Sequence, residues 1–193
     1  MRVLLNLLVL SGMENGVIPI QVLGVLPSNR GYAIFIGNQE KTFTIYVEPS
    51  VGQAITMFME GIAKERPLTH DMVGHIFAGL GVSIQRVIIN DLKNGTYFAR
   101  LILKQENELG KKIIEVDARP SDCLALAIQS KAPIFVARSV FDEVEDMSEI
   151  FKEVKQEIQK EFAAEGEEEG PSKSNPDVDE PGPEEEPPEP EKT

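Results

Sequence analysis

The feature that most constrains this 193-residue chain is an order of elements that occurs twice. Three runs rich in β-branched and aromatic residues are followed by one run with apolar residues at helical spacing, a pattern that favours an antiparallel meander covered by a helix. In the first copy, for example, Ile55, Phe58 and Ile62 recur at intervals of three and four residues. The expected strands are 18–26, 32–37 and 41–48, then 83–91, 96–105 and 111–118, and the expected helices are 50–63 and 121–131.

The two copies also align without a gap when the sequence is shifted by 69 residues. Val47 then meets Val116, and Glu48 meets Asp117. Few identities survive, so the duplication depends on the order of the elements. We therefore predict an α+β fold in which two strand-strand-strand-helix halves contribute a mainly antiparallel sheet, with helices packed outside it.

Further elements are expected around the two copies. A helix is predicted over residues 69–80, a short buried strand over 133–137 and a final helix over 140–162, while Asn94-Gly95 is typical of a hairpin turn. The apolar stripe of the first of these helices consists of Val73, Ile76, Phe77 and Leu80.

Charge divides the chain into three segments. Residues 163–193 contain twelve acids and two lysines and almost nothing apolar, so we expect a disordered Glu/Pro-rich acidic tail. Residues 18–162 are expected to form one domain, because the first 162 residues are nearly neutral at −3 and long enough for one core. Residues 1–17 are a first strand or an extension that resembles a short signal peptide without a cleavage site, and Met13 is an alternative start.

Several protein classes are disfavoured. Cys123 is the only cysteine, so an internal disulfide is impossible and a cytoplasmic location is expected. No run approaches the roughly 20 apolar residues of a membrane span, so no membrane partner is expected. The sequence lacks a phosphate-binding glycine loop, a Cys-x-x-Cys pair and a Gly-x-Ser-x-Gly elbow.

Two similar segments carry the candidate chemistry, "RPLTHD" at 66–71 and "RPSD" at 119–122. Each places Arg-Pro before a hydroxyl residue and an Asp at a predicted helix N-terminus, where free N–H groups and the helix dipole favour an anion. The guanidinium group of Arg matches the geometry of a phosphate. The predicted phosphate-binding residues are Arg66, Thr69, Arg119 and Ser121.

Acidic and histidine side chains of the same segments supply the other parts of a metal-assisted phosphodiesterase. Mg²⁺ or Mn²⁺ takes one or two carboxylates plus substrate oxygens, and a neighbouring His can transfer protons. We predict Asp71, Asp117 and Asp122 as metal ligands and His70 as the proton-transfer group. The predicted catalytic residues are therefore His70, Asp71, Asp117 and Asp122.

Each of these residues also has a purely structural interpretation. Thr69 and Ser121 are good helix N-caps, and Asp is favoured in a first helical turn whatever its function. The two Arg residues can simply neutralise those carboxylates. For Glu48 and Asp117, which end equivalent strands, a turn or capping role competes with a metal site.

The sequence resembles the bifunctional nuclease domain family over about residues 18–140, in "RPLTHD", "NGTYFARLIL" and "VDARPSDCLALAIQSKAPIFV". The resemblance implies an α+β fold, a homo-oligomer such as a dimer, and the activity on RNA and DNA reported for some members. This chain differs at Cys123, where Ala is usual, and in its acidic tail, where some members carry a partner-binding helical module. The family's characteristic positions fall on Arg66, Pro67, Thr69, His70, Asp71, Asp117, Arg119, Pro120, Ser121 and Asp122.

The expected function is thus metal-assisted cleavage of RNA and DNA. The alternative is a non-catalytic binding or regulatory module that holds an anionic ligand or a protein partner, and a third hypothesis is a scaffold whose acidic tail recruits that partner. A nearly neutral domain without a basic stripe argues against broad nucleic-acid binding, which depends on many phosphate contacts.

Overall fold

The computed structural model of this chain describes residues 16–29, 31–62, 65–108 and 110–168. The predictions for residues 1–15 and for most of the acidic tail, residues 169–193, fall outside these ranges. The chain divides into two compact units, one ending at Val154 and one starting at Lys155. All candidate site residues belong to the first unit.

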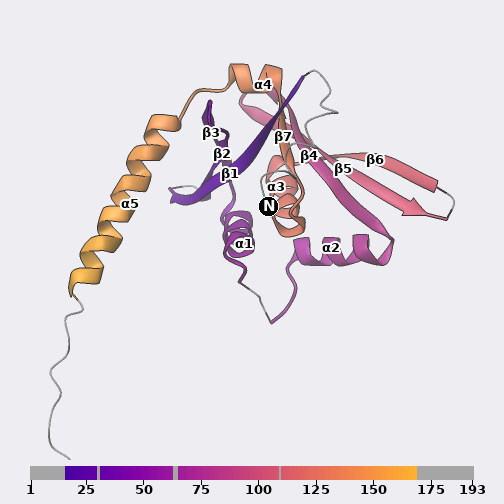
Figure 1. The fold of residues 1–193 in the computed structure, drawn as a ribbon, viewed down its shortest axis with the longest axis horizontal. Coiled ribbons are helices and arrows are strands. Elements are labelled where there is room, and N and C mark those ends of the chain that lie inside the picture. Colours follow the sequence, from indigo (N-terminus) through magenta and orange to yellow (C-terminus); the bar gives the residue numbers. More distant parts are fainter. Residues whose placement is uncertain (1–15, 30, 63–64, 109, 169–193) are drawn as a thin grey trace, which may run out of the picture. The chain divides into compact units, whose positions relative to one another are not determined.

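Seven strands of the first unit form one sheet, in the order β3-β2-β1-β7-β4-β5-β6 (Figure 1). Strands β1 to β3 form one antiparallel meander and β4 to β6 form another. The short strand β7 joins them, because it pairs antiparallel with β1 and parallel with β4. The bounds are β1 Val17–Ser28, β2 Gly31–Gly37, β3 Thr42–Val47, β4 Val82–Lys93, β5 Thr96–Asn107, β6 Gly110–Ala118 and β7 Ile134–Ala137.

Each meander is followed by one helix. Helices α1 and α3 pack against each other, and α1 also contacts β2 while α3 contacts β4 and β5. The structure therefore confirms the predicted α+β fold with two strand-strand-strand-helix halves. The helices are α1 Pro49–Glu60, α2 Thr69–Gly79, α3 Pro120–Ser130, α4 Arg138–Glu143 and α5 Ser148–Glu168.

The two halves align at a sequence offset that differs from the predicted one. The N-caps of the two equivalent helices are Glu48 and Arg119, which are 71 residues apart and not 69. In both helices Pro occupies the first position, Pro49 and Pro120, where its fixed φ and missing N–H suit a helix start. Glu48 therefore corresponds to Arg119 and not to Asp117.

The core lies between the sheet and helices α1 and α3. Six residues of α3 are buried, from Pro120 to Ala127, whereas α2 buries none. The predicted apolar stripe of α2 is only partly a core face, because Ile76 is 49% exposed and Leu80 is 63% exposed. Helix α2 thus packs lightly, through Val73 and Phe77, which are partly buried against the core.

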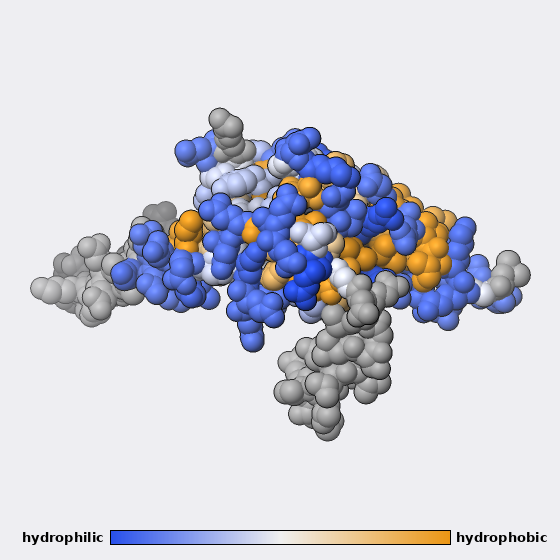
Figure 2. All heavy atoms as spheres, turned by 90° about the horizontal axis from the view of Figure 1, so that it is seen from above, coloured by the Kyte–Doolittle hydropathy of each residue, from blue (hydrophilic) through white to orange (hydrophobic). Residues whose placement is uncertain are grey.

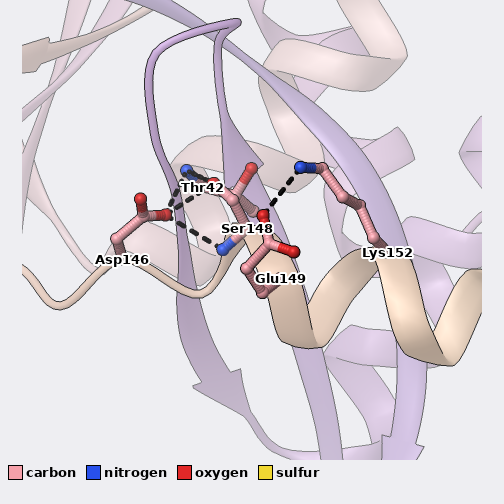
Figure 3. Close-up of polar contacts among 5 residues, drawn as sticks. All are labelled: Thr42, Asp146, Ser148, Glu149 and Lys152. Atoms are coloured by element: carbon pink, nitrogen blue, oxygen red, sulfur yellow. Dashed lines mark hydrogen bonds and ion pairs between the residues drawn. The ribbon is translucent and has the colours of Figure 1, made fainter.

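The predicted final helix over 140–162 is wrong in its bounds, because the chain breaks into α4 and α5 between Val144 and Met147. Figure 3 shows Asp146 at this break. Its Oδ1 accepts hydrogen bonds from the Ser148 N–H at 2.9 Å and the Thr42 N–H at 3.4 Å. The Lys41 ammonium group also donates to the carbonyl oxygen of Phe141, in α4, at 2.7 Å. These bonds tie the break to the sheet.

A tight hairpin turn joins β4 to β5. The Asn94-Gly95 hairpin is confirmed, since both residues have positive φ, 51° and 76°, as a two-residue type I′ loop requires. Among the described residues, no helix combines the length and apolar character needed to span a membrane.

The surface carries some apolar side chains. Figure 2 shows such side chains gathered on the half of its face that holds β4–β6. The exposed large apolar residues of β5 and β6 are Phe98, Ile113 and Val116. The homo-oligomer remains a prediction.

Candidate functional site

The site begins where β6 passes into α3. Arg119 is the N-cap of α3 with extended backbone, φ −65° and ψ 142°, which is the conformation that a following Pro imposes. Asp122 lies three positions further on, in the first helical turn. The Arg119 Nε–H donates to Oδ2 of Asp122 at 2.9 Å, and an Nη2–H donates to Oδ1 at 3.4 Å. The guanidinium plane is therefore held against one carboxylate.

A histidine from helix α2 completes this cluster across 52 residues of sequence. Nε2 of His70 lies 3.3 Å from Oδ1 of Asp122. The imidazole side chain is only 13% exposed, and its ring meets the ring of Phe58 edge to face with centroids 6.2 Å apart. Asp122 and Phe58 together fix the orientation of the imidazole.

Electrostatics determines which atoms of this cluster carry protons. Burial alone would raise the pKa of Asp122, but the hydrogen bond and charge of Arg119, with a further contribution from His70, outweigh burial and lower that pKa below 3.8. Asp122 is therefore ionised at neutral pH and can only accept hydrogen bonds. Nε2 of His70 is therefore placed to donate its hydrogen to this carboxylate.

Two cavities flank this cluster. One, of about 320 Å³, is lined by Thr69, His70 and Asp122 together with Ser50. The other, of about 360 Å³, is lined by aromatic and small residues and by Ser121. Glu48 and Arg119 line both cavities, so the two hollows adjoin at these residues.

The first Arg-Pro segment forms a neighbouring cavity instead of joining the cluster. Arg66, Asp71 and His75 line a hollow of about 310 Å³, which shares Leu68 with the His70 cavity. The carboxylate of Asp71 accepts the Leu68 N–H at 2.7 Å and a bond from the Gln129 side-chain amide. Both carboxylate oxygens of Asp71 are thus engaged in holding the start of α2 against α3.

Asp117 lies at the exposed end of β6, opposite Arg100 in the strand register. Burial first, and then the charges of Asp122 and Asp117, raise the pKa of the Cys123 thiol to about 12. The thiol is therefore neutral and buried.

The structure does not gather the predicted metal set into a cage. In the described parts of the chain, no group of three or more His, Cys, Asp or Glu side chains is arranged to hold a metal ion. Metal binding by Asp122, Asp117 and Asp71 stays a prediction, and any ion would depend on one or two carboxylates and on substrate oxygens.

The capping interpretation of the hydroxyl residues is wrong. The N-caps of α2 and α3 are Leu68 and Arg119, and neither residue makes a cap hydrogen bond with its own side chain; in α2 the Asp71 carboxylate accepts the Leu68 N–H instead. The reason is that Pro120 already starts α3 one residue before Ser121, and that α2 begins at Thr69 itself. Thr69 and Ser121 line the two cavities instead, and phosphate binding by them stays a prediction.

Three further residues line these hollows. The capping role considered for Glu48 is wrong, because its side chain makes no cap hydrogen bond, and Glu48 lines both cavities. Tyr46 and Tyr97 line the larger cavity and lie outside the Arg-Pro segments. The alternation of Phe43, Ile45 and Val47 into the core is the signal that places Tyr46 on the other, exposed face of β3.

A family model described as the bifunctional nuclease domain matches residues 34–149. This chain belongs to the bifunctional nuclease domain family. The match contains both Arg-Pro segments, Glu48, Tyr46 and the whole His70–Asp122–Arg119 cluster.

Individual relatives are similar over shorter stretches. The uncharacterized protein Rv1829 of Mycobacterium tuberculosis strain H37Rv is 37% identical over 103 residues, which are 53% of this chain and 58% of that protein. Bifunctional nuclease 1 of Oryza sativa subsp. japonica is 30% identical over 83 residues, 42% of this chain and 24% of the rice protein. The match thus covers less than two thirds of either relative.

Proposed function

We propose that this chain hydrolyses phosphodiester bonds of RNA and DNA at the His70–Asp122–Arg119 cluster. The observation that carries the proposal is the placement of an oriented imidazole, an ionised carboxylate and a guanidinium group at one cavity. Membership of the bifunctional nuclease domain family supports the nucleic-acid substrate.

Arg119 would hold the phosphate. Its guanidinium group has five N–H donors, of which two are used on Asp122. The remaining three are available, and the side chain is 62% exposed. Asp122 therefore fixes the direction of the fork without exhausting its capacity for a phosphate oxygen.

His70 would move the proton. With Nε2–H donating to Asp122, Nδ1 is the atom that takes a proton from an attacking hydroxyl group or water, and an Asp behind an imidazole stabilises the cation that then forms. A positioned general base of this kind contributes typically about 10²- to 10⁴-fold to a rate.

A divalent ion in this cavity would have few protein ligands. Asp122 has two carboxylate oxygens with acceptor capacity beyond its bonds to Arg119 and His70, and Glu48 lines the same cavity. Mg²⁺ or Mn²⁺ would be held by these two carboxylates and would add positive charge beside the phosphate. Asp71 is a poor additional ligand because it lines the neighbouring Arg66 cavity and not this one, where its carboxylate holds Leu68 and Gln129.

One observation favours the alternative of a non-catalytic binding module. Basic side chains that could track a polynucleotide are paired with acids: Arg100 with Glu115 at 2.7 Å, and Lys104 with Glu106. These two pairs leave fewer free donors on β5 for the phosphates of a polynucleotide. A small anionic ligand at Arg119 would then be held without being cleaved.

The test is cleavage of labelled single-stranded RNA and DNA by protein purified through a stringent last step. Parallel reactions contain Mg²⁺, Mn²⁺ or chelator. Asp122→Asn is compared with Asp142→Asn, a matched change at an exposed carboxylate of α4.

We expect metal-dependent cleavage by the wild type and Asp142→Asn, and a loss of at least about 100-fold in Asp122→Asn. Equal cleavage by all three proteins, or cleavage by none, would contradict the proposal. In the second case, a thermal-shift screen with nucleotides and inorganic phosphate tests the binding module, because a ligand of the folded state raises Tm.

A further inference from the structure

The cavity on the other side of Arg119 is not used by the proposed hydrolysis. Its volume is about 360 Å³, which lies within the usual range of roughly 300–1,000 Å³ for small-ligand sites. It lies between the end of β3 and the β4–β5 hairpin, and Arg119 and Ser121 of the α3 start complete its lining.

Tyr46 is the unusual residue of this cavity. Its neighbours in β3, Ile45 and Val47, are 5% and 7% exposed, whereas Tyr46 is 70% exposed. No ring contact in the described part of the chain involves Tyr46, while Tyr97 on the opposite wall stacks on the core residue Phe43 with centroids 6.1 Å apart. One aromatic wall is therefore anchored and the other presents an open ring face.

The remaining lining residues suit a flat polar ring beside a phosphate. Thr96 and Ser121 offer hydroxyl groups, which can hydrogen-bond the edge of a base. The hairpin that carries Thr96 is held in place by the two-residue Asn94-Gly95 turn. Arg119, shared with the His70 cavity, holds the junction between the two hollows.

We propose that this cavity is a nucleobase subsite, in which Tyr46 stacks on an unpaired base adjacent to the phosphate held by Arg119. Every base has a π-face, so stacking on an exposed aromatic ring binds single strands with little sequence preference. A base inside a duplex cannot present that face to Tyr46. The inference rests on the proposed function and specifies its substrate as single-stranded RNA or DNA.

A binding experiment tests this subsite without depending on cleavage. Wild type, Tyr46→Ala and Tyr46→Phe are titrated, in chelator, with short labelled oligonucleotides that carry either normal bases or abasic positions at equal phosphate number. Tyr46→Ala should bind the normal oligonucleotide about 5- to 100-fold more weakly, and Tyr46→Phe should bind like the wild type. The abasic oligonucleotide should bind all three proteins equally.

A second readout uses the absence of tryptophan from the sequence. Tyr46→Trp keeps a stacking ring and introduces a single indole, whose fluorescence a stacked base quenches. Phe98→Trp, an exposed aromatic position that does not line the cavity, is the matched control. Quenching in Tyr46→Trp alone supports the subsite.

The results separate this inference from the proposed function. Base-dependent binding through Tyr46 without any cleavage would support the subsite and reject the nuclease. Cleavage with identical affinities of Tyr46→Ala and wild type for both oligonucleotides would overturn the subsite and leave the nuclease standing. Quenching of both indoles, or of neither, would also overturn it.

Discussion

The two helix starts at α1 and α3 have the same backbone and different chemistry. Each follows the third strand of its meander, has an extended N-cap and places Pro at the first helical position without a side-chain cap. The N-cap is Glu48 in one and Arg119 in the other. The third helical position is Val51 in α1 and Asp122 in α3, and only Asp122 meets a histidine.

The two copies share the backbone that starts each helix, and they differ in the charged side chains that form the site. A strand that ends in an extended residue before Pro is sufficient to start both helices, because Pro fixes φ and needs no N–H partner. The charged residues of α3 are therefore free from a capping role, and they form an ion pair that faces a cavity. In α1 the corresponding charge, Glu48, lines the same cavity. One site is built from both copies, with unequal contributions.

The largest expected difference is in cleavage, between Arg119→Gln and Glu48→Gln, which are identical replacements at equivalent N-caps. Loss of a phosphate donor typically costs about 10²- to 10³-fold in rate. We expect a loss of that size for Arg119→Gln and less than about tenfold for Glu48→Gln, measured as kcat/KM on single-stranded RNA at saturating Mg²⁺, because Asp122 and substrate oxygens still hold the ion in the Glu48 variant. Comparable losses in the two variants would show that the copies contribute equally.

A smaller difference is expected in stability at the fourth helical position, which is Gly52 in α1 and Cys123 in α3. A Cβ atom on Gly52 would lie 2.3 Å from the ring of Tyr32, so Gly52→Ala should destabilise the fold by about 1–3 kcal/mol in spite of the better helix propensity of Ala. Cys123→Ala removes one buried atom and should cost about 1 kcal/mol.

Urea unfolding measures both free energies. A Gly52→Ala variant as stable as the wild type would mean that Tyr32 moves at no cost and that the two helices tolerate the same side chains.

The smallest expected effect is the pH dependence of the ion pair in α3, which α1 lacks. The folded-state pKa of Asp122 is lowered, so its stabilising contribution is complete above the unfolded pKa of about 3.9 and is lost as pH falls through the lower folded value. Asp122→Asn should be less stable than the wild type by about 0.2–1 kcal/mol at pH 7, because a partly exposed ion pair usually contributes about that much to the free energy of unfolding.

That difference should shrink as the pH falls below about 4. Thermal unfolding of wild type, Asp122→Asn and Asp142→Asn between pH 3 and 7 measures it. A difference that stays constant over this range would show that protonation of Asp122 does not control it.

The strands and the helices α1, α2 and α3 could be predicted because their period and composition are local properties. The break between α4 and α5 could not, since part of what holds it is distant in sequence: the Met147 N–H donates to the Thr42 carbonyl oxygen at 2.7 Å, and Asp146 accepts the Thr42 N–H, 104 residues earlier in the sequence. The final helix also continues to Glu168, six residues beyond the predicted boundary at Phe162.

The site likewise combines one contact within a single helical turn with contacts between residues far apart in the sequence. The Arg119–Asp122 pair is encoded by spacing within one helical turn. The contact of His70 with Asp122 spans 52 residues and depends on how α2 packs on α3. Glu48 and Asp71 show both kinds of information. Only packing places Glu48 at the cavities, whereas the bond of Asp71 to the Leu68 N–H is the local role that a first-turn Asp predicts, and its bond to Gln129 is long-range.

The most direct test uses the two histidines of the chain, both on helix α2. Single-turnover cleavage of single-stranded RNA is measured for the wild type, His70→Gln and His75→Gln, purified identically. We predict a loss of about 10²- to 10⁴-fold for His70→Gln and a rate within about threefold of the wild type for His75→Gln. Equal rates for the two variants, or a greater loss for His75→Gln, would contradict the assignment of the reaction to the His70–Asp122–Arg119 cluster.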